Sequence, residues 1–115
     1  MLIRSQNKSM IVNFDNICTV SAFPEKDSED IYVEDGTGSL MVGRYSTKEK
    51  AMKVLDMIQK AYVDYQTAHT VSNGLATTSL FVDCSDETNE LYMKVQNALG
   101  KVTVFQMPED LEVEV

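Results

Sequence analysis

Basic residues are scarce in this chain. It carries 10 lysines and arginines against 18 aspartates and glutamates, which gives a formal net charge of −8 at pH 7. Proteins that bind DNA or RNA do so mainly by neutralising backbone phosphates with positive charge. The charge balance therefore argues against DNA or RNA as a partner, although a small anionic ligand held in one local pocket stays compatible with it.

Cysteine and histidine are nearly absent. Cys18 and Cys84 stand far apart with no second cysteine beside either, so zinc and redox motifs are missing and two reduced thiols are expected. The single histidine, His69, has no other metal-ligating residue at suitable spacing, and we expect it to be a solvated loop residue. The sequence therefore predicts neither a metal site nor a bound cofactor.

Long apolar runs are also missing. No segment approaches the ~20 apolar residues of a membrane span, and the opening MLIRSQNK lacks the apolar core of a signal peptide. We therefore expect an intracellular protein that does not bind a membrane. A length of 115 residues suits a single domain with one core.

Motifs for catalysis do not occur either. The glycines at positions 36 and 38 follow Asp35 in a stretch that a hairpin turn explains fully, and neither glycine-rich stretch has the lysine of a phosphate-binding loop. Cys84 lies among acidic residues that disfavour its nucleophilic thiolate form. We therefore expect that the protein is not an enzyme.

One strong helical pattern is present, over residues 46–65 (STKEKAMKVLDMIQKAYVDY). Its apolar residues recur three and four positions apart, as on one face of a helix. Ser46 and Glu49 have the S-x-x-E spacing of a capping box, so they predict the start of the helix. The apolar stripe comprises Ala51, Val54, Leu55, Ile58, Ala61, Tyr62 and Tyr65.

Short apolar and alternating segments precede this helix and predict strands. We therefore expect an antiparallel meander of about five strands packed on the helix, which is an α+β fold. The polar stretch 24–30 predicts a loop within the meander. The expected strands cover residues 2–4, 10–14, 17–23, 31–34 and 39–45.

After the helix, the sequence predicts a smaller strand–helix–strand segment. Residues 67–78 are small and polar around Asn73-Gly74, so we expect a loop there. The three elements that follow are expected at 79–83, 86–99 and 102–107, with Pro108 ending the last strand.

The predicted domain spans residues 1–108, and an acidic tail follows at 109–115. The tail alternates acidic and apolar residues, so it can pair at a sheet edge or stay partly disordered. We expect partial disorder.

Arg4 and Arg44 are the only arginines of the chain. Guanidinium groups bind phosphate or carboxylate with two hydrogen bonds, so both residues are candidate ligand-binding residues. An ion pair with one of the many acids is the alternative role. Tyr45 and Phe105 are the aromatic candidates for stacking on a base, and their alternative is a place in the core.

Three segments carry a resemblance to known proteins: MLIRSQNK with IVNFDNI, then GRYSTKEKAMKVLDMIQKAY, then VFQMPED. They resemble a family of short, mostly uncharacterised proteins of Firmicutes genomes, their phages and other mobile elements. The resemblance covers residues 1–66 and 101–110, which makes 67–100 look like an insertion. It implies a phage or mobile-element protein in the cytoplasm of a bacterial host.

Other small, acidic, non-enzymatic phage proteins often work by binding, and this analogy suggests two functions for the present chain. The first is an anti-defence protein, a homo-oligomer that sequesters a nucleotide second messenger without turning it over. Its ligand-binding residues would be Arg4, Arg44, Tyr45 and Phe105, in a site shared between subunits because two arginines are few for a diphosphate. The second is an interaction module that inhibits or recruits a host protein.

Overall fold

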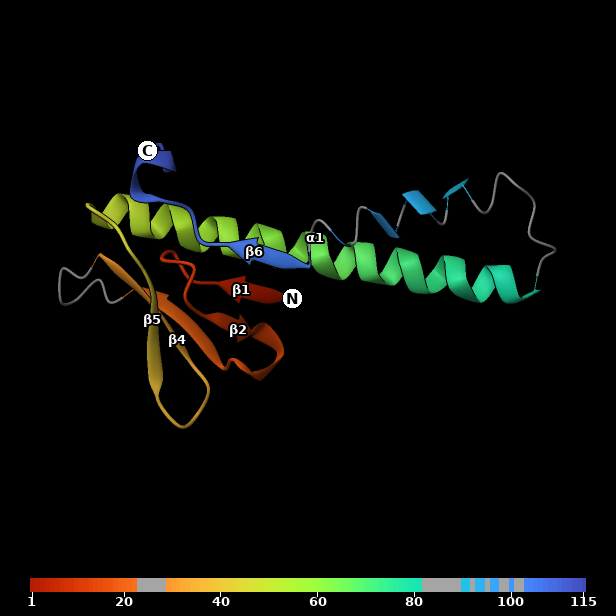
Figure 1. The fold of residues 1–115 in the computed structure, drawn as a ribbon, viewed down its shortest axis with the longest axis horizontal. Coiled ribbons are helices and arrows are strands. Elements are labelled where there is room, and N and C mark those ends of the chain that lie inside the picture. Colours follow the sequence, from red (N-terminus) through yellow and green to blue (C-terminus); the bar gives the residue numbers. More distant parts are fainter. Residues whose placement is uncertain (23–28, 82–89, 92, 95, 98–99, 101–102) are drawn as a thin grey trace.

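In the computed structural model, the chain folds as one long helix packed against two small sheets (Figure 1). The structure describes residues 1–22, 29–81, 90–91, 93–94, 96–97, 100 and 103–115. The α+β class predicted from the sequence is confirmed. In chain order, the elements are β1 (Leu2–Arg4), β2 (Ile11–Asn13), the 3-10 turn η1 (Phe14–Asn16), β3 (Thr19–Ala22), β4 (Asp30–Glu34), β5 (Ser39–Arg44), α1 (Lys48–Phe81), β6 (Val104–Gln106) and the 3-10 turn η3 (Asp110–Glu112).

The first sheet brings together strands from both ends of the chain. Its order is β2-β1-β6, with β1 antiparallel to β2 and parallel to β6. Ile3 is paired with Val12 on one side and Phe105 on the other. Because paired residues share a face of a sheet and neighbours along a strand alternate, these three side chains face the core and Arg4 faces outward.

The second sheet has the antiparallel order β3-β4-β5. The five predicted N-terminal strands are therefore present, but the single meander expected from the sequence is wrong. Asn13 Oδ1 accepts a hydrogen bond from the Asp15 backbone NH at 3.0 Å, which begins η1 and turns the chain out of the first sheet before β3. The two sheets meet where the Gln6 NH donates to the Val42 carbonyl at 2.8 Å.

The core lies between the sheets and the first half of α1. On the helix, Ala51, Val54 and Ile58 are at most 3% exposed. The predicted apolar stripe therefore faces the core, with these three residues buried and the other four, Leu55, Ala61, Tyr62 and Tyr65, partly buried against it. The partners of the helix in the core include Ile3, Val12, Ile31, Val33, Val42 and Met107.

The helix is much longer than the sequence pattern predicted. The loop expected at 67–78 is wrong, and so is the strand expected from residue 79, because α1 continues to Phe81; positions 82–83 lie outside the described residues. Asn73 and Gly74 have poor helix propensity, but tertiary packing overrides such preferences. Ser72 is buried, and its Oγ accepts a hydrogen bond from Gln96 Nε2 at 2.6 Å.

The predicted helix cap is one residue out of place. The helix begins at Lys48, and the Thr47 Oγ1 and carbonyl accept the backbone NH groups of Lys50 and Ala51, both at 3.2 Å. Thr47 is therefore the N-cap in place of Ser46. The Ser46 NH instead donates to Asp110 Oδ1 at 2.7 Å, which draws this residue to the C-terminal tail.

The C-terminal tail is ordered, so the expected partial disorder is wrong. Residues 110–112 form η3, and Val113 is only 4% exposed. Lys50 Nζ donates to the Asp110 carbonyl at 2.8 Å and lies 3.4 Å from Asp110 Oδ2. The tail is held because the Val113 side chain is buried in the core and the Lys50–Asp110 ion pair attaches the tail to the first turn of α1.

The second half of α1 extends well past the sheets (Figure 1). The radius of gyration is 17.5 Å, against about 13 Å for a compact chain of this length. Within the predicted helix 86–99, positions 90–91, 93–94 and 96–97 are helical, and the remaining positions lie outside the described residues. Among the residues the structure describes, no helix is both long and apolar enough to cross a membrane.

Candidate functional site

Arg44 is engaged in an ion pair at the end of β5. Its Nε lies 3.0 Å from Asp30 Oδ1, and its Nη2 donates to Asp30 Oδ2 at 3.4 Å. The hydrogen bond to Asp30 raises the pKa of the guanidinium above its ordinary value. The alternative role predicted for this arginine is thus confirmed, although its side chain stays 70% exposed.

Arg4 holds the loop that follows its own strand. Its Nε and Nη2 donate to the Lys8 carbonyl at 3.4 and 3.3 Å. Lys8 has a positive φ of 63°, a strained conformation for a residue with a side chain. Arg4 therefore helps to close the β1–β2 loop, and it lies on the outward face of the first sheet.

Tyr45 and Phe105 are placed toward the core. Tyr45 is 1% exposed, and its hydroxyl donates to the Pro108 carbonyl at 3.0 Å. Burial, with a smaller contribution from Glu109, raises the pKa of the Tyr45 hydroxyl far above its ordinary value. Phe105 faces the core beside Ile3, opposite to Arg4. Within one protomer, these four predicted ligand-binding residues do not form a common site.

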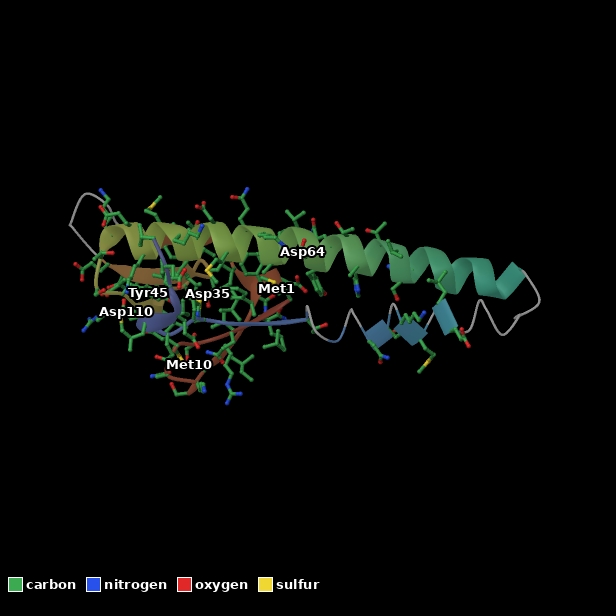
Figure 2. All side chains as sticks on the ribbon, turned by 90° about the horizontal axis from the view of Figure 1, so that it is seen from above. Met1, Met10, Asp35, Tyr45, Asp64 and Asp110 are labelled. Atoms are coloured by element: carbon green, nitrogen blue, oxygen red, sulfur yellow. The ribbon has the colours of Figure 1, made fainter. Side chains whose placement is uncertain are left out.

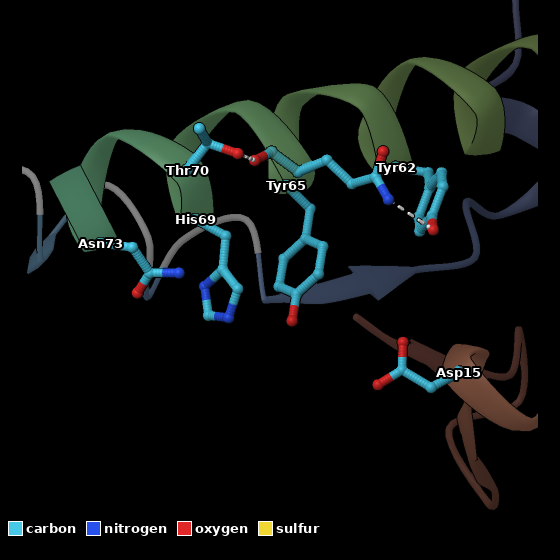
Figure 3. A pocket seen from close by; sticks show the side chains of 7 residues that line it. Asp15, Tyr62, Tyr65, His69, Thr70 and Asn73 are labelled. Carbon is cyan, nitrogen blue, oxygen red and sulfur yellow. Dashed lines mark hydrogen bonds between the residues drawn. The ribbon is translucent and has the colours of Figure 1, made fainter.

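A different site lies between η1 and the middle of α1 (Figure 3). It is an open groove of about 450 Å³, within the range of about 300–1,000 Å³ that is typical of small-molecule sites. One wall is a single face of the helix, because the lining residues recur three and four positions apart. The groove is lined by Asp15, Tyr62, Tyr65, Gln66, His69, Thr70 and Asn73.

The aromatic rings of the groove are held in place by their neighbours. The rings of Tyr65 and His69 are stacked, with centroids 5.2 Å apart and planes 22° from parallel. Tyr62 packs against Phe14 of η1, with ring centroids 4.9 Å apart. Gln66 Nε2 donates to the Tyr62 hydroxyl at 2.7 Å. The groove therefore presents a fixed aromatic surface beside amide, hydroxyl and carboxylate groups.

Among the residues that the structure describes, no lysine or arginine lines the groove. Asp15 is the acidic residue of the lining, and Figure 3 shows its carboxylate across the groove from the Tyr65 ring. Such a set of side chains can stack on a flat ring and exchange hydrogen bonds with it. The described side chains of the lining include no cation for a phosphate.

Two features of the sequence conceal this groove. Tyr62 and Tyr65 were assigned to the apolar stripe, and they are in fact only partly buried. His69 was expected in a loop, whereas it is an exposed residue of α1. A helical pattern continues from Tyr62 to Asn73 and is the signal that could have revealed this face, but the Asn73-Gly74 pair concealed it.

Clusters for other chemistry are not found in the described part of the chain. No three His, Cys, Asp or Glu residues there are placed to hold a metal ion. Cys18 is an exposed free thiol, and Cys84 lies outside the described residues.

The groove is the candidate site on geometric grounds alone, because comparisons with known proteins assign this chain to no family. The chain matches no family model, no curated protein and no solved structure.

Proposed function

We propose that this protein is a non-enzymatic binding protein of a phage or mobile element, which sequesters a nucleotide second messenger of host antiviral defence. The observation that carries the proposal is the groove with the stacked Tyr65–His69 rings. An aromatic surface bordered by hydrogen-bonding groups suits a nucleobase and its sugar. The phage context rests on the resemblance of the sequence segments described above.

The phosphates of such a ligand need positive charge from outside the groove. Arg4 and Arg44 do not line it, and the net charge of −8 offers no general attraction. Both arginines are exposed, so a second copy of the chain can bring them to the groove of its neighbour. We therefore propose a homo-oligomer, in which symmetry supplies the cations that one protomer lacks at the site.

A melting-shift experiment tests the function. The protein is heated with nucleosides, cyclic nucleotides and ADP-ribose derivatives, and a ligand at a hundred times its Kd should stabilise the native state by about 2.7 kcal/mol. The bound compound should be recovered chemically unchanged after denaturation. A panel in which no compound raises Tm would contradict the proposal, and recovery of a converted product would show an enzyme instead.

Two variants on α1 locate the binding site. His69→Ala removes one of the stacked rings at an exposed position, so it should abolish the ligand-induced shift and leave the Tm of the free protein nearly unchanged. Val63→Ala is the matched control, because Val63 is 54% exposed on the same helix and does not line the groove. Equal ligand shifts in both variants would place the site elsewhere.

A protein-interaction module is the second candidate, and the extended half of α1 favours it. Val71 on this half of α1 is 47% exposed, and Leu91 and Met93, at the helical positions that follow α1 in the chain, are 50% and 57% exposed. Exposed apolar side chains of this kind can serve as anchors for a partner protein. In that case no nucleotide would alter Tm, and Val71→Glu would abolish binding of a purified host partner while His69→Ala would not.

A further inference from the structure

The inference concerns Asp15, the acidic member of the groove lining. Its position is fixed by local bonds: its NH donates to Asn13 Oδ1 at 3.0 Å, and the Ile17 NH donates to the Phe14 carbonyl at 3.1 Å to close the turn. Phe14 in turn packs on Tyr62 of α1. The backbone of Asp15 is therefore held opposite the helix, and Figure 3 shows the carboxylate on that side of the groove.

A carboxylate placed there selects ligand groups by charge. It accepts hydrogen bonds and donates none, and among the described residues of the same protomer no lysine or arginine of the lining offsets its charge. It therefore repels a phosphate group in the groove. Two neighbouring hydroxyl groups on one sugar suit it well, because its two oxygens can accept both, and hydrogen bonds to an ionised acceptor are the stronger kind.

We propose that Asp15 binds the free 2′,3′-diol of a ribose whose base stacks on the Tyr65–His69 rings. This inference rests on the proposed function and narrows its ligand class. The groove then selects nucleosides and ADP-ribose derivatives with an intact diol. It disfavours compounds in which the 2′- or 3′-oxygen is missing or carries a phosphate, because the carboxylate loses a donor or meets a negative charge. The same use of an acidic side chain on a ribose hydroxyl occurs in dinucleotide-binding folds.

Titration calorimetry with simple probes tests this inference. Adenosine, guanosine, cytidine and uridine are compared with their 2′-deoxy forms, on the wild-type chain and on Asp15→Asn. We expect the 2′-deoxy form of the best-bound nucleoside to bind the wild type at least tenfold more weakly. In Asp15→Asn, we expect the two forms to bind with nearly equal affinity, because the charged acceptor is gone.

Asp56→Asn is the matched control, since it removes one exposed carboxylate from α1 outside the groove. It should keep the tenfold preference for the ribose form. If Asp56→Asn loses the preference as Asp15→Asn does, net charge explains the selectivity and the assignment of Asp15 is overturned.

The remaining outcomes separate this inference from the proposed function. If ribose and deoxyribose forms bind the wild type equally, the role of Asp15 is overturned while nucleoside binding stands. If no nucleoside binds, both are overturned. Tetramethylammonium serves as a further probe, and tighter binding of this cation than of any nucleoside would reassign the groove to cationic ligands. The wild-type comparison decides the question even if Asp15→Asn fails to fold.

Discussion

Tyr45 shows how much one side chain contributes to joining the parts of this molecule. Its ring is buried next to the start of α1, and its hydroxyl donates to the Pro108 carbonyl just after β6 (Figure 2). Gly43 leaves room for this ring, because a Cβ at that position would stand 3.1 Å from its edge and 3.0 Å from Met107 Cε. Tyr45, the residue after β5, thus fits against Gly43 and is hydrogen-bonded to Pro108, which follows β6 of the first sheet.

Tyr45→Phe should lower the free energy of unfolding by about 0.5–1.5 kcal/mol, the usual net value of one hydrogen bond. The raised pKa of this hydroxyl also predicts a pH effect. A pKa that is higher in the folded state stabilises the protein below the unfolded value, near 10, and this stability is lost as pH rises above it. Urea denaturation at pH 8 and pH 10.5 measures both effects.

Comparing the pH-dependent loss of stability in wild type and in Tyr45→Phe isolates the effect of Tyr45, because the other four tyrosines remain in both proteins. Wild type should lose more stability than Tyr45→Phe between the two pH values. An equal loss would mean that Tyr45 does not keep its proton through burial.

At the scale of single elements, local signals predicted α1 and the strands but not their full extent. The repeat from Ala51 to Tyr65 gave the correct buried face because a 3.6-residue period is encoded locally. Beyond Tyr65 a helical spacing continues only to Asn73, and the Ser72–Gln96 hydrogen bond that packs this part of α1 joins residues 24 positions apart, so no local pattern predicts it. The pairing of β1 with β6 escaped prediction for the same reason.

The candidate site could be predicted only in part. Tyr62 and Tyr65 were singled out by their spacing, but the sequence does not encode locally that Asp15 lies opposite them. Arg4 and Arg44 were chosen because arginine is scarce, and their neighbours Lys8 and Asp30 became visible only in the folded chain.

The burial of the helix stripe predicts a graded set of stabilities. Ile58→Ala should cost about 2–5 kcal/mol, because Ile58 is 3% exposed and its truncation leaves a cavity. Leu55→Ala should cost less, since Leu55 is only partly buried. Met57→Ala, at a position that is 37% exposed, should stay within about 0.5 kcal/mol of wild type. Urea midpoints that are equal for Ile58→Ala and Met57→Ala would show that the stripe does not face the core.

At the scale of the whole molecule, the C-terminal tail connects β6 of the first sheet to the start of α1. Asp110 is the centre of this attachment, and the Ser46 backbone NH is the main reason that its pKa lies below the ordinary value. A group whose pKa is lowered on folding stabilises the protein above its unfolded pKa, and that stability is lost as pH falls through the folded value.

Asp110→Asn should therefore lower Tm at pH 6 more than at pH 2.5, because the stabilisation from the charged carboxylate declines as the pH falls below its ordinary pKa of 3.8. Scanning calorimetry at both pH values measures the difference. Asp56→Asn, which removes an exposed carboxylate of α1, should not show this pattern. A pH-independent effect of Asp110→Asn would mean that the charge of the carboxylate plays no part in holding the tail.

The parallel pairing of β1 with β6 also has a consequence for the order of events on the ribosome. Gln6 and Pro108, which are hydrogen-bonded beside these strands, stand 102 positions apart. At a synthesis rate of about 5–20 residues per second, this distance takes roughly 5–20 s to translate. During that time β1 has β2 on one edge and no partner on the other, and an open strand edge is where nascent chains associate wrongly. β1 is thus synthesised before the other described strands but gains its second partner only after all of them.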